Sequence, residues 1–460
     1  MQVYGLEVSL KNVPVLDTGY IPMAAFCRAF EQSAQNGPEI AVAVERNGGC
    51  VAVRRVRVHG TEAMQQADRV YVERLVKMLL WAYGGYKVYV GGDRALGDYI
   101  AATYAAGGAR AFDAEFMSRV YEKAFEVVCC DLADVPAEKS GAQSVGRHLE
   151  GCRIGFDAGG SDRKVSAVVD GVPVYSEEVV WFPKTNSDPD YHYEGILSAF
   201  RSAASKMPRV DAIGVSSAGI YVDNRTMVAS LFLQVPQDQF DQKVKDIYIR
   251  AAKALGDIPL EVANDGDVTA LAGAMSLEEN RILGIAMGTS EAAGYVDAEG
   301  NITGWLNELA FAPVDLQDDA MVDEWSGDKG CGVKYFSQDS VIKLAPRAGI
   351  VLDEGLSPAE KLKVVQAAMN EGSESARDIY RTIGVYLGHA LAYYATFYDI
   401  GHVLLLGRVM SGEGGDLVIA EAHRVLAEEY PAVQMELHLP NEKIRRVGQS
   451  VAAASLPSLR

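Results

Sequence analysis

Apolar residues in the first third of the chain alternate between strand-like and helix-like spacings. Residues 40–60 predict a strand, a turn at Asn47-Gly48 and a second strand, because Asn-Gly between two alternating apolar runs favours a hairpin. The same patterns predict the remaining elements of this part: a helix at 70–83, a strand at 87–92, and helices at 95–106 and 114–127. The polar, small-residue stretch 131–151 then indicates a linker or a surface excursion.

The rest of the chain alternates strand and helix patterns, which favours layered α/β architecture. We therefore expect two parts: an N-terminal α/β domain of unknown role over residues 1–150, and a larger α/β domain over residues 151–460. A length of 460 residues agrees with more than one domain.

Composition argues against several classes of function. The formal net charge of −19 argues against a broad nucleic-acid or anionic-membrane surface, since phosphates repel acidic proteins. There is no apolar run of about 18 residues and no signal-like N-terminus, so no membrane partner is expected. The six cysteines form no CxxC pair. A reducing cytoplasm is the simplest location.

Two predicted hairpins carry glycine-rich turns. The first, residues 152–171, has Asp157 at the end of its first strand and then Ala-Gly-Gly-Ser; the second, residues 281–304, turns through Met-Gly-Thr-Ser. Glycine lets backbone N–H groups approach an anion, and an acid at a strand end can hold Mg²⁺ directly or through water. Each hairpin alone is also consistent with an ordinary turn.

The stretch VANDGDVTALAGA, residues 262–274, places Asn264, Asp265 and Asp267 where a strand ends and a helix begins. An N-cap needs only one of the three. We assign the cap to Asp267, a proton-accepting role to Asp265 and a hydroxyl contact to Asn264. The alternative is that all three serve the helix terminus.

A fourth stretch, HVLLLGRVMSGEGGD at residues 402–416, is a buried strand followed by a glycine loop that can lie against an adenosine. Neither GxGxxG nor the P-loop spacing is present. A plain crossover loop is the alternative interpretation.

In this order the stretches resemble the actin, Hsp70 and sugar-kinase superfamily, and residues 152–460 resemble its ROK family of sugar kinases and sugar-responsive repressors. DAGGSD (157–162) is similar to the family's DxGGT turn, IGVSSAGIYVDN (213–224) to GIGxPGxVD, and VANDGDVTAL (262–271) to the segment with the catalytic aspartate. IAMGTSEAAGYVDAEG (285–300) resembles the second phosphate turn, LNELAF (306–311) the GEIGH segment, and LLLGRVMSG (404–412) the adenosine loop.

The resemblance implies a two-lobed actin-like ATPase fold of ribonuclease H-like α/β type, with ATP and Mg²⁺ as cofactors. It implies a base at Asp265 and Mg²⁺ held through water by Asp157. The implied sugar contacts are Asn264, Glu308, Ser217 and Gly219. The implied nucleotide contacts are Asp157, Gly159, Gly160, Ser161, Gly288, Thr289, Gly407 and Gly412.

The chain departs from the family at its zinc site. Phe311 stands at the histidine position, and Glu324, Ser326 and Cys331 stand at the three cysteine positions. One thiolate is too little for a structural zinc site, so we expect no zinc. Apolar packing of Trp305, Phe311 and Trp325 is expected to hold the loop instead.

Two acids depart from the phosphate turns: Glu291 in the second and Asp162 after the first. Acids beside a phosphate repel it unless a cation intervenes, so either they bind metal or ATP binding is weak or lost. The N-terminal part lacks a helix-turn-helix, which argues against a repressor. A lid or an oligomer surface is a guess at its role, and a homodimer is possible.

The sequence thus favours ATP-dependent phosphorylation of a hexose or amino-sugar hydroxyl. The alternatives are a non-catalytic sugar or nucleotide sensor on the same fold, and a superfamily kinase acting on a non-sugar substrate. His192, in a polar segment, is expected at the surface or at the border of a pocket.

Overall fold

The computed structural model describes residues 1–141, 145–440 and 448–459. The chain divides into two compact units. Unit 1 consists of Met1–Gly141, Ile285–Ala293 and Trp305–Leu439, and unit 2 of Ala142–Gly284, Gly294–Gly304 and Pro440–Arg460. The expected domain boundary near residue 150 lies close to the change of unit at residue 142. Residues 1–141 nevertheless pack with residues 305–439 in one unit, and whether they form a domain in their own right stays a prediction.

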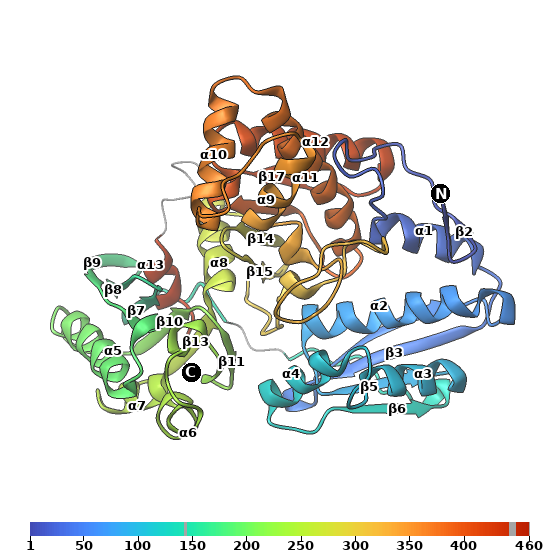
Figure 1. Cartoon of the computed structure of the whole chain (residues 1–460). Helices are drawn as coiled ribbons and strands as arrows, with labels where there is room; N and C mark the ends of the chain where they lie inside the picture. Colours follow the sequence, from blue (N-terminus) through green and yellow to red (C-terminus); the bar gives the residue numbers. More distant parts are fainter. Residues whose placement is uncertain (142–144, 441–447, 460) are drawn as a thin grey trace. The chain divides into compact units, whose positions relative to one another are not determined.

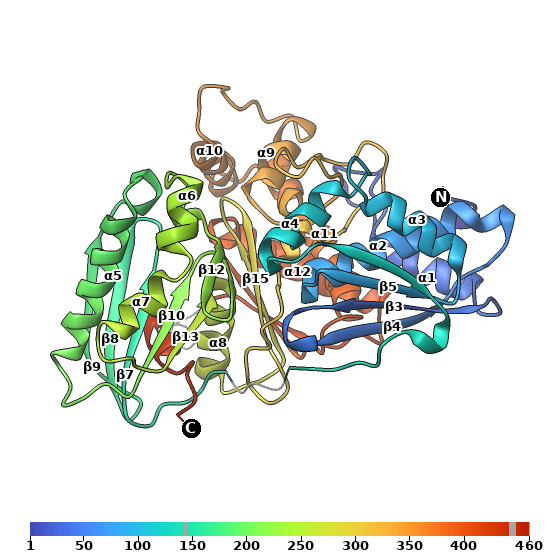
Figure 2. The ribbon, with the colours of Figure 1, turned by 90° about the horizontal axis from the view of Figure 1, so that it is seen from below.

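Unit 2 is built on a five-stranded sheet (Figure 2). Its strands are β7 (Cys152–Ala158), β8 (Asp162–Val169), β9 (Val172–Val180), β10 (Ala212–Ser217) and β13 (Leu260–Asn264). They lie in the order β13-β10-β7-β8-β9; β7, β8 and β9 are antiparallel neighbours, and β10 is parallel to both β7 and β13. An antiparallel meander extended by two parallel strands is the ribonuclease H-like arrangement found in actin-like ATPases. This confirms the expected fold class.

Helices cover both faces of this sheet. They are α5 (Pro189–Ala204), α7 (Ile247–Lys253), α8 (Asp265–Leu277) and α13 (Gln449–Ala454). Because alternate strand residues face opposite sides, Phe156 packs edge-on against Phe200 of α5 at 5.5 Å, whereas Gly155 faces α13. A Cβ at Gly155 would collide with the backbone of α13, so glycine permits the close approach. Unit 2 also contains a hairpin of β11 (Ile220–Val222) and β12 (Arg225–Val228) and the short helix α6 (Gln237–Gln239).

The first part of unit 1 contains a second sheet, in the order β4-β3-β5-β6 (Figures 1 and 2). Its strands are β3 (Glu39–Glu45), β4 (Val51–Arg57), β5 (Lys87–Gly91) and β6 (Glu126–Cys130). Its helices are α1 (Met23–Ser33), α2 (Gln65–Tyr83), α3 (Arg94–Tyr104) and α4 (Ala111–Tyr121), and the two-residue strands β1 (Gln2–Val3) and β2 (Leu6–Glu7) precede them. The predicted hairpin at 40–60 is confirmed.

The helix predicted at 114–127 is wrong at its end. Helix α4 ends at Tyr121 because Glu122 adopts a left-handed conformation with φ 52°. Residues 126–130 form β6 instead and pair in parallel with β5. The two valines of this segment favour a strand, and the tertiary pairing decides between the two structures.

The second part of unit 1 has a sheet in the order β15-β14-β16-β17. Its strands are β14 (Ile282–Met287), β15 (Glu291–Val296), β16 (His402–Leu406) and β17 (Glu436–His438). Its helices are α9 (Gln338–Arg347), α10 (Pro358–Asn370), α11 (Glu374–Tyr394) and α12 (Glu413–Glu429), and α11 packs along α12 (Figure 1). Among the described residues, no helix has both the length and the apolar character needed to cross a bilayer.

Candidate functional site

Three neighbouring parallel strands of unit 2 end at the same edge of the sheet with polar residues. Ser216 of β10 lies opposite Asp157 of β7, and Ser217 lies opposite Asn264 of β13. Asp265 follows Asn264 as the first residue of α8. Ligands of open α/β sheets bind at the carboxyl ends of the strands. The register therefore gathers Asp157, Ser217, Asn264 and Asp265, all expected from the sequence.

The junction of β13 and α8 is fixed by the Asn264 side chain. Its amide oxygen accepts a hydrogen bond from the Gly266 N–H at 2.7 Å, and its amide nitrogen donates to the Gly219 carbonyl at 2.7 Å. Asn264 is thus the N-cap, and the assignment of the cap to Asp267 is wrong. Asp267 is buried and accepts from the backbone N–H of Tyr295 at 3.0 Å, so it ties α8 to β15.

Two carboxyl groups in this region resist ionisation. Burial raises the pKa of Asp265, against the opposing effects of the Gly266 N–H and the Lys184 cation. Burial also raises the pKa of Asp157 to about 6; the hydrogen bond from Ser216 opposes this and the charge of Asp265 adds to it. A carboxyl whose pKa is moved towards neutrality is suited to accept a proton near neutral pH.

The first glycine turn is held by a residue that the sequence analysis missed. The indole N–H of Trp181 donates to the Gly159 carbonyl at 2.7 Å, and the Trp181 backbone N–H donates to the Ser161 carbonyl at 3.1 Å. Lys184 lies across Gly160, where an added Cβ would come within 3.0 Å of its ammonium nitrogen. A cation therefore lies beside the backbone of the expected phosphate turn. No motif in WFPKTN indicates either role.

The acid that follows this turn has partners of its own. Asp162 accepts a hydrogen bond from the Ser161 hydroxyl at 3.0 Å and lies 3.6 Å from the Lys164 ammonium group. Its charge is thus partly compensated by the chain itself.

Glu291, the second departing acid, is buried in unit 1. Its side chain lies against Gly332, where an added Cβ would collide with one carboxyl oxygen. Within the part of the chain that the structure describes, neither carboxyl oxygen has a hydrogen-bond partner. Burial raises its pKa well above the ordinary value, and the charge of Glu308 acts in the same direction. Glu291 is therefore harder to ionise than an exposed glutamate, and its side chain points into the packed interior of unit 1.

The remaining glycines of the expected nucleotide site meet at the end of the second sheet of unit 1. Gly407 follows β16 with φ 94°, and a Cβ there would collide with the backbone of Met287, the last residue of β14. Gly288 and the exposed Thr289 come next in the chain, and the Gly288 carbonyl accepts from the Gln338 N–H at 2.9 Å. The glycine loop after β16 therefore abuts the second turn. Gly412, with φ 66°, is exposed and is the N-cap residue that precedes α12.

The segment with Glu308 is attached to the end of helix α2. The backbone N–H groups of Asn307 and Glu308 donate to the carbonyls of Ala82 and Trp81, both at 2.9 Å. The last carbonyls of a helix lack partners within it, so these two bonds satisfy groups that otherwise need water. The Tyr398 hydroxyl also donates to the Asn307 side chain at 3.1 Å. The N-terminal part of the chain thus sets the position of Glu308.

Aromatic side chains hold the loop that contains residues 324–331, as expected. Phe311 packs against Trp81 with a ring separation of 4.4 Å, and Trp325 packs against Phe311 at 5.3 Å. Trp305 packs against Tyr83 at 4.6 Å. Two of these contacts use α2, which the sequence analysis did not foresee.

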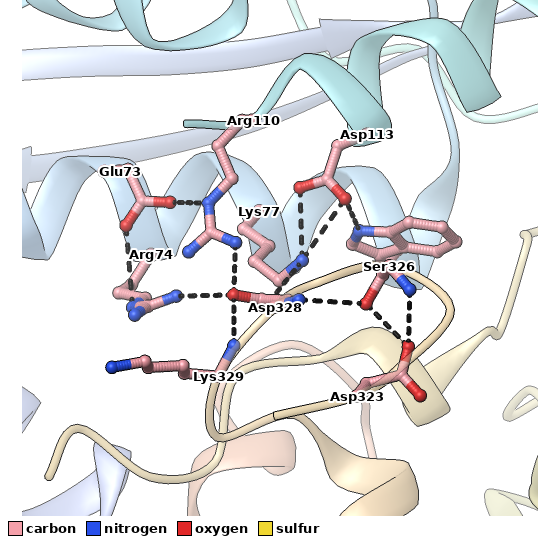
Figure 3. Close-up of polar contacts among 10 residues, drawn as sticks. Glu73, Arg74, Lys77, Arg110, Asp113, Asp323, Ser326, Asp328 and Lys329 are labelled. Carbon is pink, nitrogen blue, oxygen red and sulfur yellow. Dashed lines mark hydrogen bonds and ion pairs between the residues drawn. The ribbon is translucent and has the colours of Figure 1, made fainter. Parts of the chain in front are cut away.

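A buried cluster of six charges also holds this loop (Figure 3). The Lys77 ammonium group, fully buried, lies 3.1 Å from Asp113 and 2.9 Å from Asp328. Arg110 pairs with Asp328 at 2.5 Å and also with Glu73. Arg74 completes the cluster, with 3.5 Å to Glu73 and 4.0 Å to Asp328. Three cations balance three acids, and Asp328 is the member contributed by the loop.

The residues at the former cysteine positions have other contacts. Glu324 forms an ion pair with Lys334, and the Ser326 hydroxyl donates to Asp323 at 2.7 Å. Burial raises the pKa of the Cys331 thiol to about 12, which keeps it protonated. The expected absence of zinc stays a prediction.

Two further residues are more buried than expected. Ser217 is fully buried, and its hydroxyl accepts from two tyrosines at 2.7 and 2.9 Å, Tyr221 and Tyr248. His192 is also fully buried, with ring nitrogens 2.9 and 3.0 Å from backbone carbonyls, so its expected surface position is wrong. Its position in α5 turns it towards the core that the helix shares with the sheet.

No family model and no curated protein matches the chain. Solved structures do resemble it. The ROK hexokinase from Thermus thermophilus is 18% identical, with 66% of this chain and 97% of that chain covered and a TM-score of 0.49. A ROK glucokinase from Streptomyces griseus, in complex with glucose and AMPPNP, is 19% identical, with 66% and 98% covered and a TM-score of 0.46.

A ROK transcriptional regulator, a homolog of the E. coli MLC protein, is 17% identical, with 67% and 79% covered and a TM-score of 0.48. All three are ROK-family proteins. They come from the family that the motifs of this chain resemble. Identities this low do not transfer an activity.

Proposed function

We propose that the protein is an ATP-dependent sugar kinase with Asp265 as its general base. The observation that carries the proposal is the position of Asp265: it begins α8 at the carboxyl ends of three parallel strands, and burial raises its pKa. The Gly266 N–H lies 3.1 Å from Asp265 Oδ1 but makes its shorter bond, 2.7 Å, to the Asn264 cap, so capping alone does not account for a buried carboxyl at Asp265.

The chemistry assigned to Asp265 is removal of a proton from a sugar hydroxyl. The hydroxyl oxygen then attacks the γ-phosphorus of ATP, the bond from that phosphorus to the β-phosphate oxygen breaks, and ADP leaves. Asn264 has amide capacity beyond its bonds to Gly266 and Gly219 and would orient the sugar. The resemblance assigns a second sugar contact to Glu308. The buried Ser217 is better suited to support this edge through its two tyrosines.

The residues present fit a magnesium nucleotide. Asp157 is a carboxyl whose pKa is raised to about 6, first by burial and also by the charge of Asp265, so a nearby cation would stabilise its ionised form. Asp157 would hold Mg²⁺ through water. A bound Mg²⁺ supplies positive charge that offsets the charge of the transferring phosphoryl group. The backbones of Gly159, Gly160 and Ser161 would contact phosphate oxygens.

We propose further phosphate and nucleoside contacts for other residues of the chain. The Lys184 cation beside Gly160 would contact a phosphate. Gly288 and Thr289 would contact the triphosphate from the second turn, and Gly407 and Gly412 would flank the adenosine.

Two acids and the departure from the family's zinc site motivate the alternative of a sensor without catalysis. Asp162 lies near Lys164, and Glu291 is buried against Gly332 with a raised pKa, so both acids should repel a phosphate less than exposed, unpaired carboxylates would. This supports the kinase over the sensor.

The test is ADP release from MgATP over a panel of hexoses and amino sugars. We expect one sugar to raise the rate, and Asp265→Asn to lower kcat by about 10²–10⁴-fold, the usual contribution of a positioned base. Asp267→Asn is the matched control: it removes the carboxylate two residues further along α8 but keeps an oxygen that accepts from the Tyr295 N–H. Its kcat should stay near that of the wild type.

Three outcomes separate the proposals. Equal losses in the Asp265 and Asp267 variants would remove the base from Asp265. Release of ADP with no sugar but with another acceptor would favour a non-sugar kinase. Sugar binding by calorimetry without any ADP release would establish the sensor.

A further inference from the structure

Two histidines and a glutamate meet at one edge of the second sheet of unit 1. Strands β16 and β17 run parallel, with His402 opposite Glu436 and Leu404 opposite His438. Residues two apart on a strand share a face. Glu436 and His438 therefore project on the same face as His402.

The ligand atoms of these residues are close enough to share one ion. His402 Nδ1 lies 3.1 Å from His438 Nε2, and the Glu436 carboxylate lies 3.8 Å from the first and 3.9 Å from the second. Ligand atoms at tetrahedral angles and about 2.0–2.1 Å from a Zn²⁺ ion lie about 3.3–3.4 Å apart. The two nitrogens are already near that separation, and the carboxylate needs to move by only a few tenths of an ångström.

The partial exposure of these three side chains would let them bind an ion from solution. The two imidazoles are mostly buried, with 18% and 22% of their side chains exposed, so their ring positions are fixed by packing. The Glu436 side chain is 74% exposed and is free to turn. Among the described residues, these three form the one group of histidine, cysteine and acidic side chains whose ligand atoms all lie within 4.8 Å of one another.

We propose that His402, Glu436 and His438 bind a divalent transition-metal ion. Two imidazoles and one carboxylate are the donors of Zn²⁺, Co²⁺ and related ions, whereas Mg²⁺ and Ca²⁺ prefer oxygen alone. Three protein ligands leave a position for water. The place is distinct from residues 324–331, where no zinc is expected.

The position of the site in the sheet indicates a stabilising role. His402 begins β16 and Gly407 follows its end, so the ion lies about 17 Å from the glycine loop at about 3.3 Å per residue. β17 is an edge strand of three residues. A shared ion ties this short edge strand to β16 and does not take part in phosphoryl transfer.

The test uses the full-length, tag-free chain, stripped with a chelator and dialysed. Co²⁺ is titrated with visible absorption as the readout, and Zn²⁺ is then added to displace it. We expect about one Co²⁺ per chain with the absorption of a low-coordinate site, displaced by Zn²⁺, and a higher Tm with Zn²⁺. Mutation of residues that only hydrogen-bond to a metal ligand lowers the affinity for the metal by about 10–100-fold. His402→Gln and His438→Gln should cost more than that.

His423→Gln is the matched control, because His423 is an exposed histidine of α12 outside the group. It should bind Co²⁺ like the wild type. Glu436→Gln changes one atom of an exposed side chain and tests the site even if a histidine variant fails to fold, which circular dichroism would reveal. Absence of Co²⁺ binding by the wild type, or wild-type affinity in Glu436→Gln and either folded histidine variant, would overturn the proposal.

Discussion

Replacing Lys77 by Met tests whether the buried charge cluster holds the loop that follows Glu308. Lys77 is fully buried, and its ammonium group lies within 3.1 Å of both Asp113 and Asp328. Met fills a similar volume without charge. The substitution leaves three acids with two cations in this largely buried cluster (Figure 3).

The expected fall in the free energy of unfolding follows from the loss of charge balance in the cluster. Removing one partner of a buried ion pair typically costs about 3–5 kcal/mol, because the other charge stays buried without compensation. At roughly 2 °C per kcal/mol for a large unit, the Tm should fall by about 6–10 °C. Asp328→Asn removes the opposite charge and should cost a similar amount.

The double variant Lys77→Met/Asp328→Asn is the decisive comparison. It leaves Arg74 and Arg110 with Glu73 and Asp113, so the cluster is neutral again. We therefore expect the fall in Tm of the double variant to be much smaller than the sum of the falls in the two single variants. Coupling between residues in contact is commonly about 0.5–3 kcal/mol.

Acid denaturation gives an independent check. Burial acts to raise the pKa of Asp328, but Lys77, Arg110 and Arg74 outweigh it and hold the pKa well below its usual range. A depressed pKa stabilises the fold above the unfolded value, about 3.9, and this stabilisation is lost as the pH falls further. The wild type should lose Tm below about pH 4 more steeply than Asp328→Asn. Additive single shifts with parallel acid profiles would refute the reasoning.

The proposed site supports three further predictions. Because burial raises the pKa of Asp265 and brings that of Asp157 to about 6, kcat/KM should fall on acidification well above pH 4; a limb at the ordinary aspartate value would contradict this. Trp181→Phe removes the N–H bond to the Gly159 carbonyl, so the KM for ATP should rise about 5–10-fold with the sugar KM unchanged, as steady-state kinetics will show. Burial raises the pKa of Glu291, so the protonated acid is compatible with the fold at low pH and its ionisation destabilises the fold as the pH rises. Glu291→Gln should therefore have a higher Tm than the wild type at pH 8 but not at pH 4.

Local patterns in the sequence were sufficient where the structure is local. Turn residues and apolar periodicity, which are properties of neighbouring residues, were enough to predict three features. These are the 40–60 hairpin, the helix ending at Tyr83 and the strand-to-helix junction at Asn264. The cap itself was assigned to the wrong residue. Asn264 and Asp267 both suit a helix N-terminus, and only the contact of Asp267 with β15 shows that its oxygen is used elsewhere.

Long-range contacts were outside the reach of these patterns. In α2, Glu73, Arg74 and Lys77 follow the spacing of a solvated helix face, yet all three contact the buried cluster around Asp328. A sequence shows the charge of Lys77 but not the distant carboxylate that compensates it. Lys184 was missed for the same reason, because only the folded chain brings it beside Gly160.

These contacts change how residues 1–141 relate to the proposed site. Helix α2 holds the segment from Trp305 onward in three ways: its last carbonyls accept from Asn307 and Glu308, Trp81 packs on Phe311, and Lys77 pairs with Asp328. A chain without residues 1–141 would leave the Asp328 charge and the Phe311 ring without these partners. It would also free the backbone that places Glu308. The N-terminal part therefore contributes structural support to the unit that contains the proposed sugar contact Glu308.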